Sequence, residues 1–495
     1  MTFTRRQLLI GCAAGAFTPV TACAAKAIGA RFTPEAFGAA GDGVSDDYDA
    51  LRRMIAAVNS AGGGAVAFAP GRKYFLGRYI ANGRGAADLT FAGCRALTIE
   101  GNGATIAING AFIRDDPATR SLSGLRFQDC QGVTLRNLTL DGNVNRTSRF
   151  AKMVEPPSHG LAFQSCADVT IDKVIARHFA GDGLFIRESK QAGLLGRRMA
   201  SRRFTVRNSH FLFNARQGMT IGQLRGGIFE NCEFSYTGFV DAEGTGGPYG
   251  AHSPSAGVDV EPDNTPTHGN RVDVLTGDIF FRSCRMAGNY GAAFLASKFL
   301  PGERFLEQVT VQSCHLECND GLSGGQDGFI FDVPGGAVLG CTLQMKDKTA
   351  YLGWYRVSDA DPRFAGNTVT GRNSDANRPI FAVRPTTGAP TIENNRFAGE
   401  QQQPKPAGGP ASAMVFVDNP NAILRNNRFE LPGRGFRGGT VGVYLNARLA
   451  EQNTYEAEGG GSGPIGIAYA GGTAMRGEIY CGTSPLALKP KSSAR

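Results

Sequence analysis

Short apolar strands alternate with small or polar turn residues along most of this chain. In stretches such as "LRFQDCQGVTL" and "LAFQSCADVTI", a small residue occupies the position between two strands. The residues in this recurrent position are Cys94, Cys130, Cys166, Ser209, Cys232, Cys284, Cys314, Cys341, Asn367, Asn395, Asn427 and Asn453. Successive members are 23 to 52 residues apart, and a degenerate repeat of this length predicts a parallel β-solenoid.

Stacked coils bring the same turn position together on neighbouring rungs, about 4.8 Å apart. We therefore expect one internal column in which asparagine amides bond between coils and thiols act as small apolar groups. Eleven cysteines in an exported chain would normally indicate disulfides. Because several rungs carry asparagine in the same position, we predict that the column cysteines are reduced and buried.

A helix is predicted to close the start of the solenoid, over residues 46–61. Ser45 is the expected N-cap, and Asp46 and Asp47 would lie in the first turn, where the helix dipole favours acidic groups. Leu51, Met54, Ile55 and Val58 follow at helical spacing. The glycines at 62–64 would end the helix.

The stretch "FGAAGDGVSDDYDALRRMIAAVNSAGGGAVAFAPGRKYFL" resembles the opening of pectate-lyase-superfamily proteins, which are related to polygalacturonases and rhamnogalacturonases. The resemblance implies an all-β fold, a right-handed parallel β-helix with an N-terminal capping helix. That superfamily includes glycoside hydrolases, polysaccharide lyases, uronan epimerases and phage tailspikes, so the resemblance does not name a reaction. The Asp-Asp pattern of polygalacturonases is missing, because "GDGLF" stands where it would be sought. We expect one domain over residues 31–485 and a basic tail over 486–495.

Composition supports a turn-rich β protein rather than a helical bundle. Glycine is abundant at 68 residues, and charged residues make up only 19% of the chain. The net charge of +9 comes without a basic block or a stripe of basic and aromatic residues, so a nucleic-acid partner is not expected. The expected partner is a polysaccharide or oligosaccharide.

The N-terminal residues 1–25 resemble a twin-arginine export signal. Arg5 and Arg6 precede an apolar run that is too short to cross a bilayer, and small residues follow it. This pattern predicts a periplasmic or secreted protein. The "VTAC" stretch also resembles a lipoprotein processing site, in which a lipid on Cys23 would be the only membrane attachment.

Five strands align on Gly183, Gly218, Gly257, Gly291 and Gly328. The residues one and three positions after each glycine are apolar, so they should point into the coil. Positions two and four should then point outward along one solvent face. The polar residues at these outward positions are Arg187, Thr220, Asp259, Glu261 and Asp332.

Asp259 and Glu261 are the main catalytic candidates, because two outward carboxyl groups on one strand are suited to acid–base attack on a glycosidic bond. Asp182 either fixes its turn or serves as another carboxylate. The candidate substrate-binding residues are Arg216, Gln217, Arg187, Tyr249, His252 and Asp332. Arg216 is either a substrate clamp or half of a salt bridge between coils, and Tyr249 and His252 lie in a long glycine-rich loop.

Two other interpretations of the acidic strand remain open. The carboxylates could form a hydrated surface row, or Asp259, Glu261 and Asp263 could bind calcium through oxygen ligands. No cofactor is required by the favoured interpretation and no metal site is predicted; calcium is the alternative.

Hydrolysis of a polysaccharide is the favoured function. In it, Asp259 or Glu261 would protonate the leaving oxygen, and another carboxylate such as Asp182 would act as base or nucleophile. The first alternative is a polysaccharide lyase or uronan C5-epimerase, in which Arg216 would neutralise a substrate carboxylate while Tyr249 or His252 moved protons. The second alternative is a non-catalytic glycan-binding solenoid.

Overall fold

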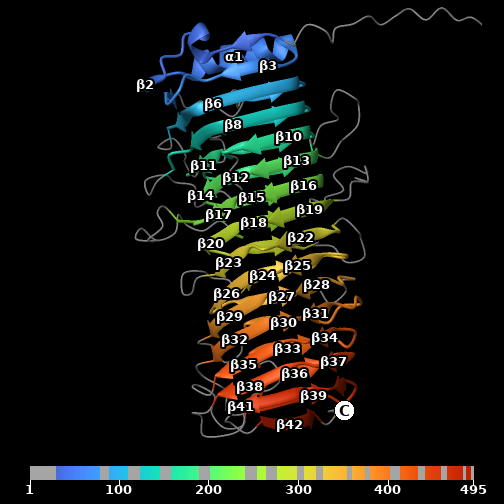
Figure 1. Ribbon diagram of the computed structural model, residues 1–495. Coiled ribbons are helices and arrows are strands. Elements are labelled where there is room, and N and C mark those ends of the chain that lie inside the picture. The colour runs from blue at the N-terminus through green and yellow to red at the C-terminus, as the bar shows by residue number, and fades with distance from the viewer. Residues whose placement is uncertain are drawn as a thin grey trace, which may run out of the picture.

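The chain folds into a right-handed parallel β-helix whose coils stack from α1 at one end to β42 at the other (Figure 1). The computed structural model describes residues 29–77, 89–109, 123–144, 158–188, 201–239, 254–262, 276–297, 306–318, 327–353, 359–373, 379–401, 413–432, 441–458, 465–482 and 486–491. The strands form two sheets, a larger sheet A and a smaller sheet B. Every internal gap in these ranges lies in a chain segment that connects to a strand of sheet B.

Sheet B has 14 parallel strands, one from each coil. Its strands are β5 (Thr90–Ala92), β7 (Leu125–Gln128), β9 (Leu161–Gln164), β12 (Asp182–Arg187), β15 (Gln217–Ile221), β18 (Val258–Val260), β21 (Phe294–Ala296), β24 (Asp327–Phe331), β27 (Thr349–Leu352), β30 (Phe381–Val383), β33 (Val415–Asp418), β36 (Val441–Asn446), β39 (Ile465–Ala470) and β42 (Leu486–Lys491). Residues 486–491, which we expected in a basic tail, thus form β42 and pair with β39.

Sheet A contains two ladders of parallel strands that close the rest of each coil. The first ladder runs from β1 (Arg31–Phe32) through β3 (Gly64–Ala67) to β40 (Ala474–Arg476). The second runs from β2 (Asp42–Asp46) through β4 (Lys73–Leu76) to β41 (Ile479–Gly482). In one coil, β9 leads to β10 (Ala167–Asp172), then to β11 (Ile175–Arg177), and then to β12. Single left-handed residues make the sharp bends, as at Ser165 and Lys173.

The interior is filled by the alternate apolar residues that the sequence pattern predicts. Phe127 lies between Phe91 and Phe163 on neighbouring coils, with ring centroids 5.3 and 4.6 Å away. Leu184, Met219 and other inward residues of sheet B are completely buried. This continuous apolar column holds the coils together because each coil covers the core of the next.

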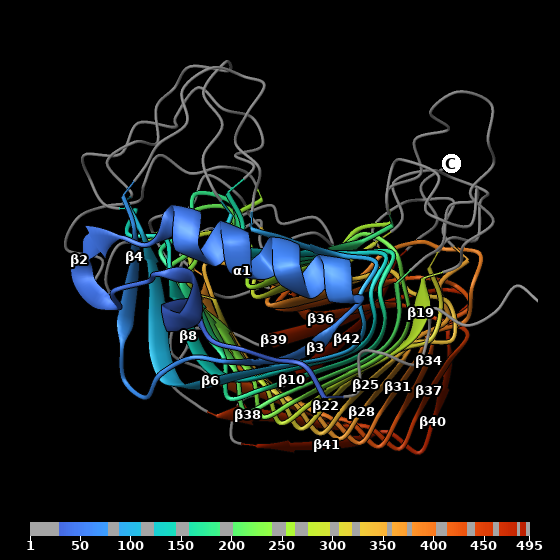
Figure 2. The same cartoon turned by 90° about the horizontal axis from the view of Figure 1, so that it is seen from above.

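The capping helix α1 (Tyr48–Ala61) begins two residues later than predicted and covers the end of the coil stack (Figure 2). Ser45 is not its N-cap; Asp47 occupies that position, and Asp46 ends β2 (Asp42–Asp46). The Asp47 carboxylate accepts hydrogen bonds from the backbone N–H groups of residues 40 and 41, so it secures the preceding turn. Gly62 ends the helix in the left-handed conformation, as expected.

The predicted single column of turn residues is in fact two columns. Between sheet B and the first ladder lie Cys94, Cys130 and Cys166. Between the first and second ladders lie Ser209, Cys232, Cys284, Cys314, Cys341, Asn367, Asn395, Asn427 and Asn453. Both turns consist of a small residue between two strands, so the sequence pattern alone could not distinguish the two columns.

All eight column and core cysteines among the described residues are buried and free, as predicted, whereas Cys481 is exposed. The thiol of Cys284 donates to the Phe229 carbonyl of the preceding coil at 3.4 Å. The Asn395 amide donates to the Phe364 carbonyl of its preceding coil at 2.8 Å. Thiol and amide therefore make equivalent bonds between coils, and this explains why either residue fits the position.

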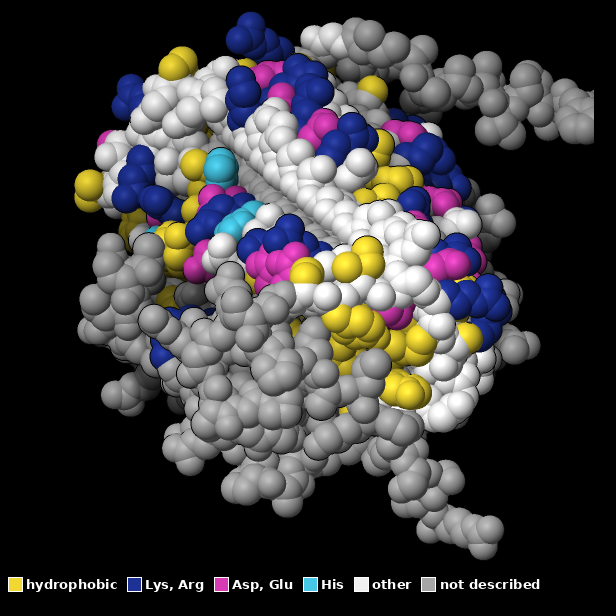
Figure 3. Space-filling view, turned by 60° about the horizontal axis from the view of Figure 1, so that its bottom comes forward, with side chains coloured by type: hydrophobic (Ala, Val, Ile, Leu, Met, Phe, Trp, Pro, Cys, Tyr) yellow, Lys and Arg dark blue, Asp and Glu magenta, His cyan; other side chains and the backbone are white. Residues whose placement is uncertain are grey.

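Charged side chains cover much of the outer surface of sheet A in pairs between coils. Arg203 contacts Asp168 at 2.5 Å, and Arg396 contacts Glu430 at 2.6 Å. Figure 3 shows acidic and basic side chains interspersed over the described part of the face in view. Such exposed pairs add little stability individually. Among the described residues, no helix is both long and apolar enough to cross a membrane.

Candidate active site on sheet B

Three neighbouring strands of sheet B, β12, β15 and β18, carry the predicted polar residues. Asp182 pairs in register with Gln217, and Thr220 pairs with Asp259. The glycines between them face the interior: a Cβ at Gly183 would lie 2.5 Å from an Asn214 side-chain nitrogen. Because glycine fills the inward position, the neighbouring polar side chains can gather on the outer face.

The alignment on glycines is correct for β12, β15 and β18 but wrong by two residues for β21. Val258 pairs with Phe294 rather than Ala292, so Gly291 lies before the strand and does not match Gly257. A slip of two residues preserves the inward and outward alternation. The predicted side-chain directions therefore survive the error.

The outward positions do not form a solvent face, contrary to our expectation. Asp259 is only 4% exposed, Thr220 is 4% exposed and Asp332 is fully buried. This rules out the hydrated surface row as a description of Asp259. Asp332 follows β24, two coils away from Asp259, and is not part of the hydrogen-bonded cluster described next.

A network of buried polar side chains crosses the three strands. The two N–H groups of Arg216 Nη1 are shared among three acceptors, both carboxylate oxygens of Asp182 at 3.1 Å and Thr220 Oγ1 at 3.5 Å. Thr220 Oγ1 donates to Gln217 Oε1, and Gln217 Nε2 donates to Asp259 Oδ2 at 2.9 Å. Arg216 is thus half of a salt bridge between coils, which was one of the two interpretations of this residue.

Asp259 and Glu261 form a carboxyl pair at the end of this network. Their side chains are hydrogen-bonded to each other. Burial raises the pKa of Asp259 well above its ordinary value of 3.8, and the negative charge of Glu261 raises it further. Two carboxyl groups in contact cannot both ionise readily, so the pair holds a proton that a neighbouring group can accept.

His159, which the sequence interpretation missed, lies beside Asp182. Its Nδ1 accepts the backbone N–H of Asp182 at 3.1 Å, and its ring stacks on Phe185 with centroids 4.5 Å apart. Burial lowers the pKa of His159 to about 4, with further lowering by the charges of Arg216, Arg126 and Arg187 against the opposing effect of Asp182. The imidazole is therefore neutral at pH 7.

A sequence signal for His159 did exist. His159 precedes Leu161 by two residues, just as Asp182 precedes Leu184, and those leucines pair in register. Extending the strand alignment by one coil would have placed His159 next to Asp182. Arg187 also lies over the Phe185 ring, with its guanidinium carbon 5.1 Å from the ring centroid.

The structure thus brings together five of the predicted residues: Asp182, Arg216, Gln217, Asp259 and Glu261. Tyr249 and His252 lie outside the described residues. So does Asp263, the third residue of the calcium alternative. Within the described ranges, no group of three or more His, Cys, Asp or Glu side chains is arranged to hold a metal ion.

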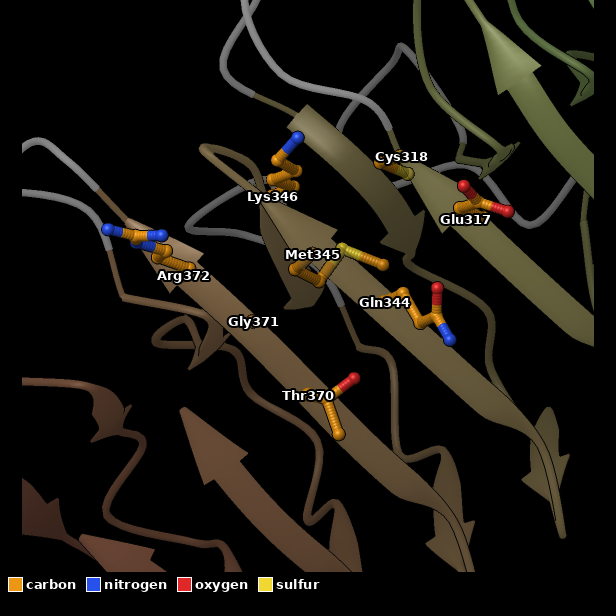
Figure 4. Close-up of a pocket in the computed structure, with 8 residues that line it drawn as sticks. All are labelled: Glu317, Cys318, Gln344, Met345, Lys346, Thr370, Gly371 and Arg372. Carbon is orange, nitrogen blue, oxygen red and sulfur yellow. The ribbon is translucent and has the colours of Figure 1, made fainter. Parts of the chain in front are cut away.

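A separate concavity of about 230 Å³ lies on the second ladder of sheet A (Figure 4). It is lined by β23 (His315–Cys318), β26 (Thr342–Lys346) and β29 (Thr368–Asn373), with Lys346 and Arg372 as its basic side chains. Both of these are exposed, and none of the predicted site residues lines the concavity. The candidate active site is therefore the buried cluster on sheet B.

Comparison with known proteins supports the fold. No family model matches the chain. The tailspike protein of E. coli bacteriophage HK620, in complex with a hexasaccharide, superposes with a TM-score of 0.52 at 12% identity, covering 90% of this chain and 78% of the tailspike chain. The likeness shows the fold, a right-handed parallel β-helix, as the N-terminal stretch predicted.

Two curated relatives match part of the sequence. A capsule KN3-specific depolymerase of Klebsiella phage KN3-1 is 29% identical over 161 residues, which are 31% of this chain and 18% of the depolymerase. Mannuronan C5-epimerase AlgE1 of Azotobacter vinelandii is 30% identical over 207 residues, 39% of this chain and 13% of the epimerase. The matched part is therefore less than a fifth of either relative.

Proposed function

We propose that this protein is an enzyme that acts on a polysaccharide and hydrolyses a glycosidic bond, with Asp259 as the general acid. The observation that carries the proposal is the pair of buried Asp259 and half-buried Glu261 on the outer face of sheet B, whose shared hydrogen bond and raised Asp259 pKa favour a bound proton. A general acid needs this property, because it must still be protonated when it meets the leaving oxygen.

The second carboxylate required for hydrolysis is Asp182. Asp259 and Glu261 touch each other, so they act as one proton-bearing unit and cannot flank a bond from opposite sides. Asp182 is on β12 and pairs in register with Gln217 of β15. Asp259 is on β18, the other neighbour of β15, and accepts a hydrogen bond from the same Gln217. Its carboxylate is oriented by Arg216, and it would serve as the base or nucleophile.

A polymeric substrate is supported by the surface that continues from the cluster. The residues that pair in register after Asp259 are apolar or aromatic: Leu295, Ile330, Tyr351, Ala382, Phe416 and Tyr444. We call these six residues the apolar row. Leu295 and Phe416 are the partly buried members of the row, and the other four are buried. Leu295 and Phe416 are therefore the members that can contact the apolar faces of sugar rings, and both curated relatives are named for action on polysaccharides.

Elimination or C5-epimerisation of a uronan is the second candidate, because of the arginines. The positive charges of Arg126, Arg187 and Arg216 all lower the pKa of the neutral His159. Guanidinium groups can neutralise a sugar carboxylate and so acidify its C5 proton. The similarity to a mannuronan epimerase favours this candidate as well.

The export of the protein remains a proposal based on Arg5 and Arg6, which lie outside the described residues.

Product analysis with the full chain distinguishes the candidates. Incubation with a panel of neutral and acidic polysaccharides should release reducing ends without the ultraviolet absorbance of unsaturated uronates if the reaction is hydrolysis. New absorbance would indicate a lyase, a changed uronate ratio by NMR would indicate an epimerase, and retention of the polymer without a product would indicate a binder.

The variants Asp259→Asn and Glu261→Gln test the residue assignment. Each should lower turnover at least about 100-fold, because the proton donor or its partner is lost. Asp168→Asn is the control, since Asp168 is a partly exposed carboxylate paired with Arg203 on sheet A. Wild-type turnover in both site variants would show that Asp259 is not the acid.

A further inference from the structure

We propose that Arg216, Thr220 and Gln217 form a directional hydrogen-bond relay that holds the proton of the carboxyl pair on the side of Asp259 that faces Glu261. The inference rests on the proposed role of Asp259. It gives Arg216 and Gln217 a positioning role in place of the substrate contacts that the sequence suggested.

The direction of the relay follows from the donor and acceptor capacity of each group. A guanidinium has only donors, so Thr220 Oγ1 must accept from Arg216 Nη1. The single hydroxyl proton of Thr220 is then left for Gln217 Oε1. The opposite end of the Gln217 amide is consequently its NH₂ group, which donates to Asp259 Oδ2.

This sequence of bonds determines which Asp259 oxygen carries the proton. Oδ2 accepts from Gln217, so it is favoured as the unprotonated oxygen. The proton is therefore favoured on Oδ1, and we assign to this oxygen the hydrogen bond that Asp259 shares with Glu261. Donation from this side leaves a negative charge that Gln217 already stabilises through its bond to Oδ2.

Burial makes the relay effective. Gln217 is fully buried, Thr220 is 4% exposed and Arg216 is 8% exposed, so water does not readily substitute for a missing member. Asp182 fixes the guanidinium at the start of the relay, and its backbone N–H is bonded to His159. The charged groups that face Asp259 are Glu261 and Arg216, while the residue paired with it on β21 is Leu295.

The test replaces Thr220, because valine has nearly the same shape as threonine but lacks the hydroxyl group. Thr220→Val removes the hydroxyl and keeps the shape, whereas Thr220→Ser keeps the hydroxyl. Titration of Asp259 is followed by NMR with ¹³C-carboxyl-labelled aspartate, and its resonance is identified by its loss in Asp259→Asn. The same variants are assayed for kcat and KM across pH.

We expect Thr220→Val to raise the titration midpoint of Asp259 by about one pKa unit, since the bond from Gln217 to the ionised carboxylate is weakened. The alkaline limb of the pH profile of kcat should move to higher pH by the same amount. KM should stay within about twofold of wild type, as a positioning role requires. Thr220→Ser should leave the midpoint in place.

The outcomes separate the relay from the proposed function. An unchanged midpoint in Thr220→Val, together with an inactive Asp259→Asn variant, overturns the relay and leaves the catalytic assignment standing. A shifted midpoint with full activity in Asp259→Asn supports the relay and removes the catalytic assignment. Equal shifts in the Val and Ser variants would trace the effect to packing, and the relay would be wrong.

Discussion

At the scale of single residues, burial determines the chemistry of the acidic strand. Asp259 and Glu261 would be two ordinary carboxylates if they faced water, and their mutual repulsion would be screened. The low exposure of Asp259 and its contact with Glu261 instead favour a bound proton. The same environment keeps His159 neutral beside three arginines. A proton donor and a set of fixed positive charges therefore lie within one short part of sheet B.

The first prediction at this scale concerns the dependence of stability on pH. The folded-state pKa of Asp259 is raised above its ordinary value of 3.8, so the folded protein binds this proton more tightly than the unfolded chain does. The free energy of unfolding should therefore fall as pH rises from about 4 towards the folded-state pKa. Asp259→Asn should lack this contribution and become the more stable of the two proteins at neutral pH.

Urea unfolding of both proteins at a series of pH values measures this difference. The control is Asp168→Asn, because the Arg203 guanidinium lowers the pKa of Asp168 and thus gives the opposite sign. A difference between Asp259→Asn and wild type that does not change with pH would contradict the buried, protonated state of Asp259.

The sequence predicted the directions of these side chains but not their surroundings. Alternation around Val258 and Val260 places Asp259 outward, and the structure agrees, because the two valines lie in the main core while Asp259 pairs with Leu295, which packs against a separate cluster. The alternation of a strand cannot say whether an outward position is covered, because the covering atoms come from other parts of the chain. The pair, the bridge from Arg216 to Asp182 and the neutral His159 all depend on contacts between coils.

At the scale of elements, two turn columns hold successive coils in register. In each column a thiol or amide donates to a carbonyl of the preceding coil, as Cys130 does to Phe91 and Asn427 to Ile392. The inward and outward alternation of the sheet B strands was predictable because it is a local feature of the sequence. The division into two columns was not, because both turns have the same local sequence and only their order within the coil differs.

The prediction for these elements is a pattern of thiol reactivity. Cys481 is exposed on β41, whereas the eight other described cysteines are buried. Burial also raises the pKa of the Cys166 thiol and raises that of Cys318 to about 12, so neither forms the reactive thiolate readily. Among the described cysteines, only Cys481 should be alkylated in the native protein, and all nine should be alkylated after denaturation.

Peptide mass spectrometry after alkylation identifies the labelled positions, and Cys481→Ser is the control that should lose native labelling. Rapid native labelling of Cys232 or Cys284 would contradict the buried columns. A disulfide-linked peptide containing any column cysteine would contradict them as well.

At the scale of the whole molecule, the solenoid converts a short sequence pattern into a long surface. Each of the six coils after that of Asp259 contributes one residue to the apolar row, so the carboxyl pair and the row lie on consecutive rungs of one axis. The N-terminal stretch and the repeat spacing predicted the β-helix and its capping helix. They did not predict the apolar row, because its members come from strands that share no motif beyond alternation.

The last prediction tests whether the apolar row binds the substrate. Phe416 pairs with Ala382, and it is five rungs from Asp259, which corresponds to about 24 Å along the axis. A short oligosaccharide at Asp259 cannot reach that far, but a polymer can. Phe416→Ala should therefore lower kcat/KM about tenfold for the polymer, from the loss of an aromatic contact worth roughly 1–2 kcal/mol, and leave a trisaccharide unaffected.

Phe280→Ala provides the matched control, because Phe280 is a 43% exposed phenylalanine on the first ladder of sheet A, away from the row. It should change neither substrate's kinetics. Steady-state rates on a series of oligosaccharides of increasing length would show where the Phe416 effect begins. If Phe416→Ala weakens short and long substrates equally, the loss is a general effect on the fold, and the row does not carry the polymer.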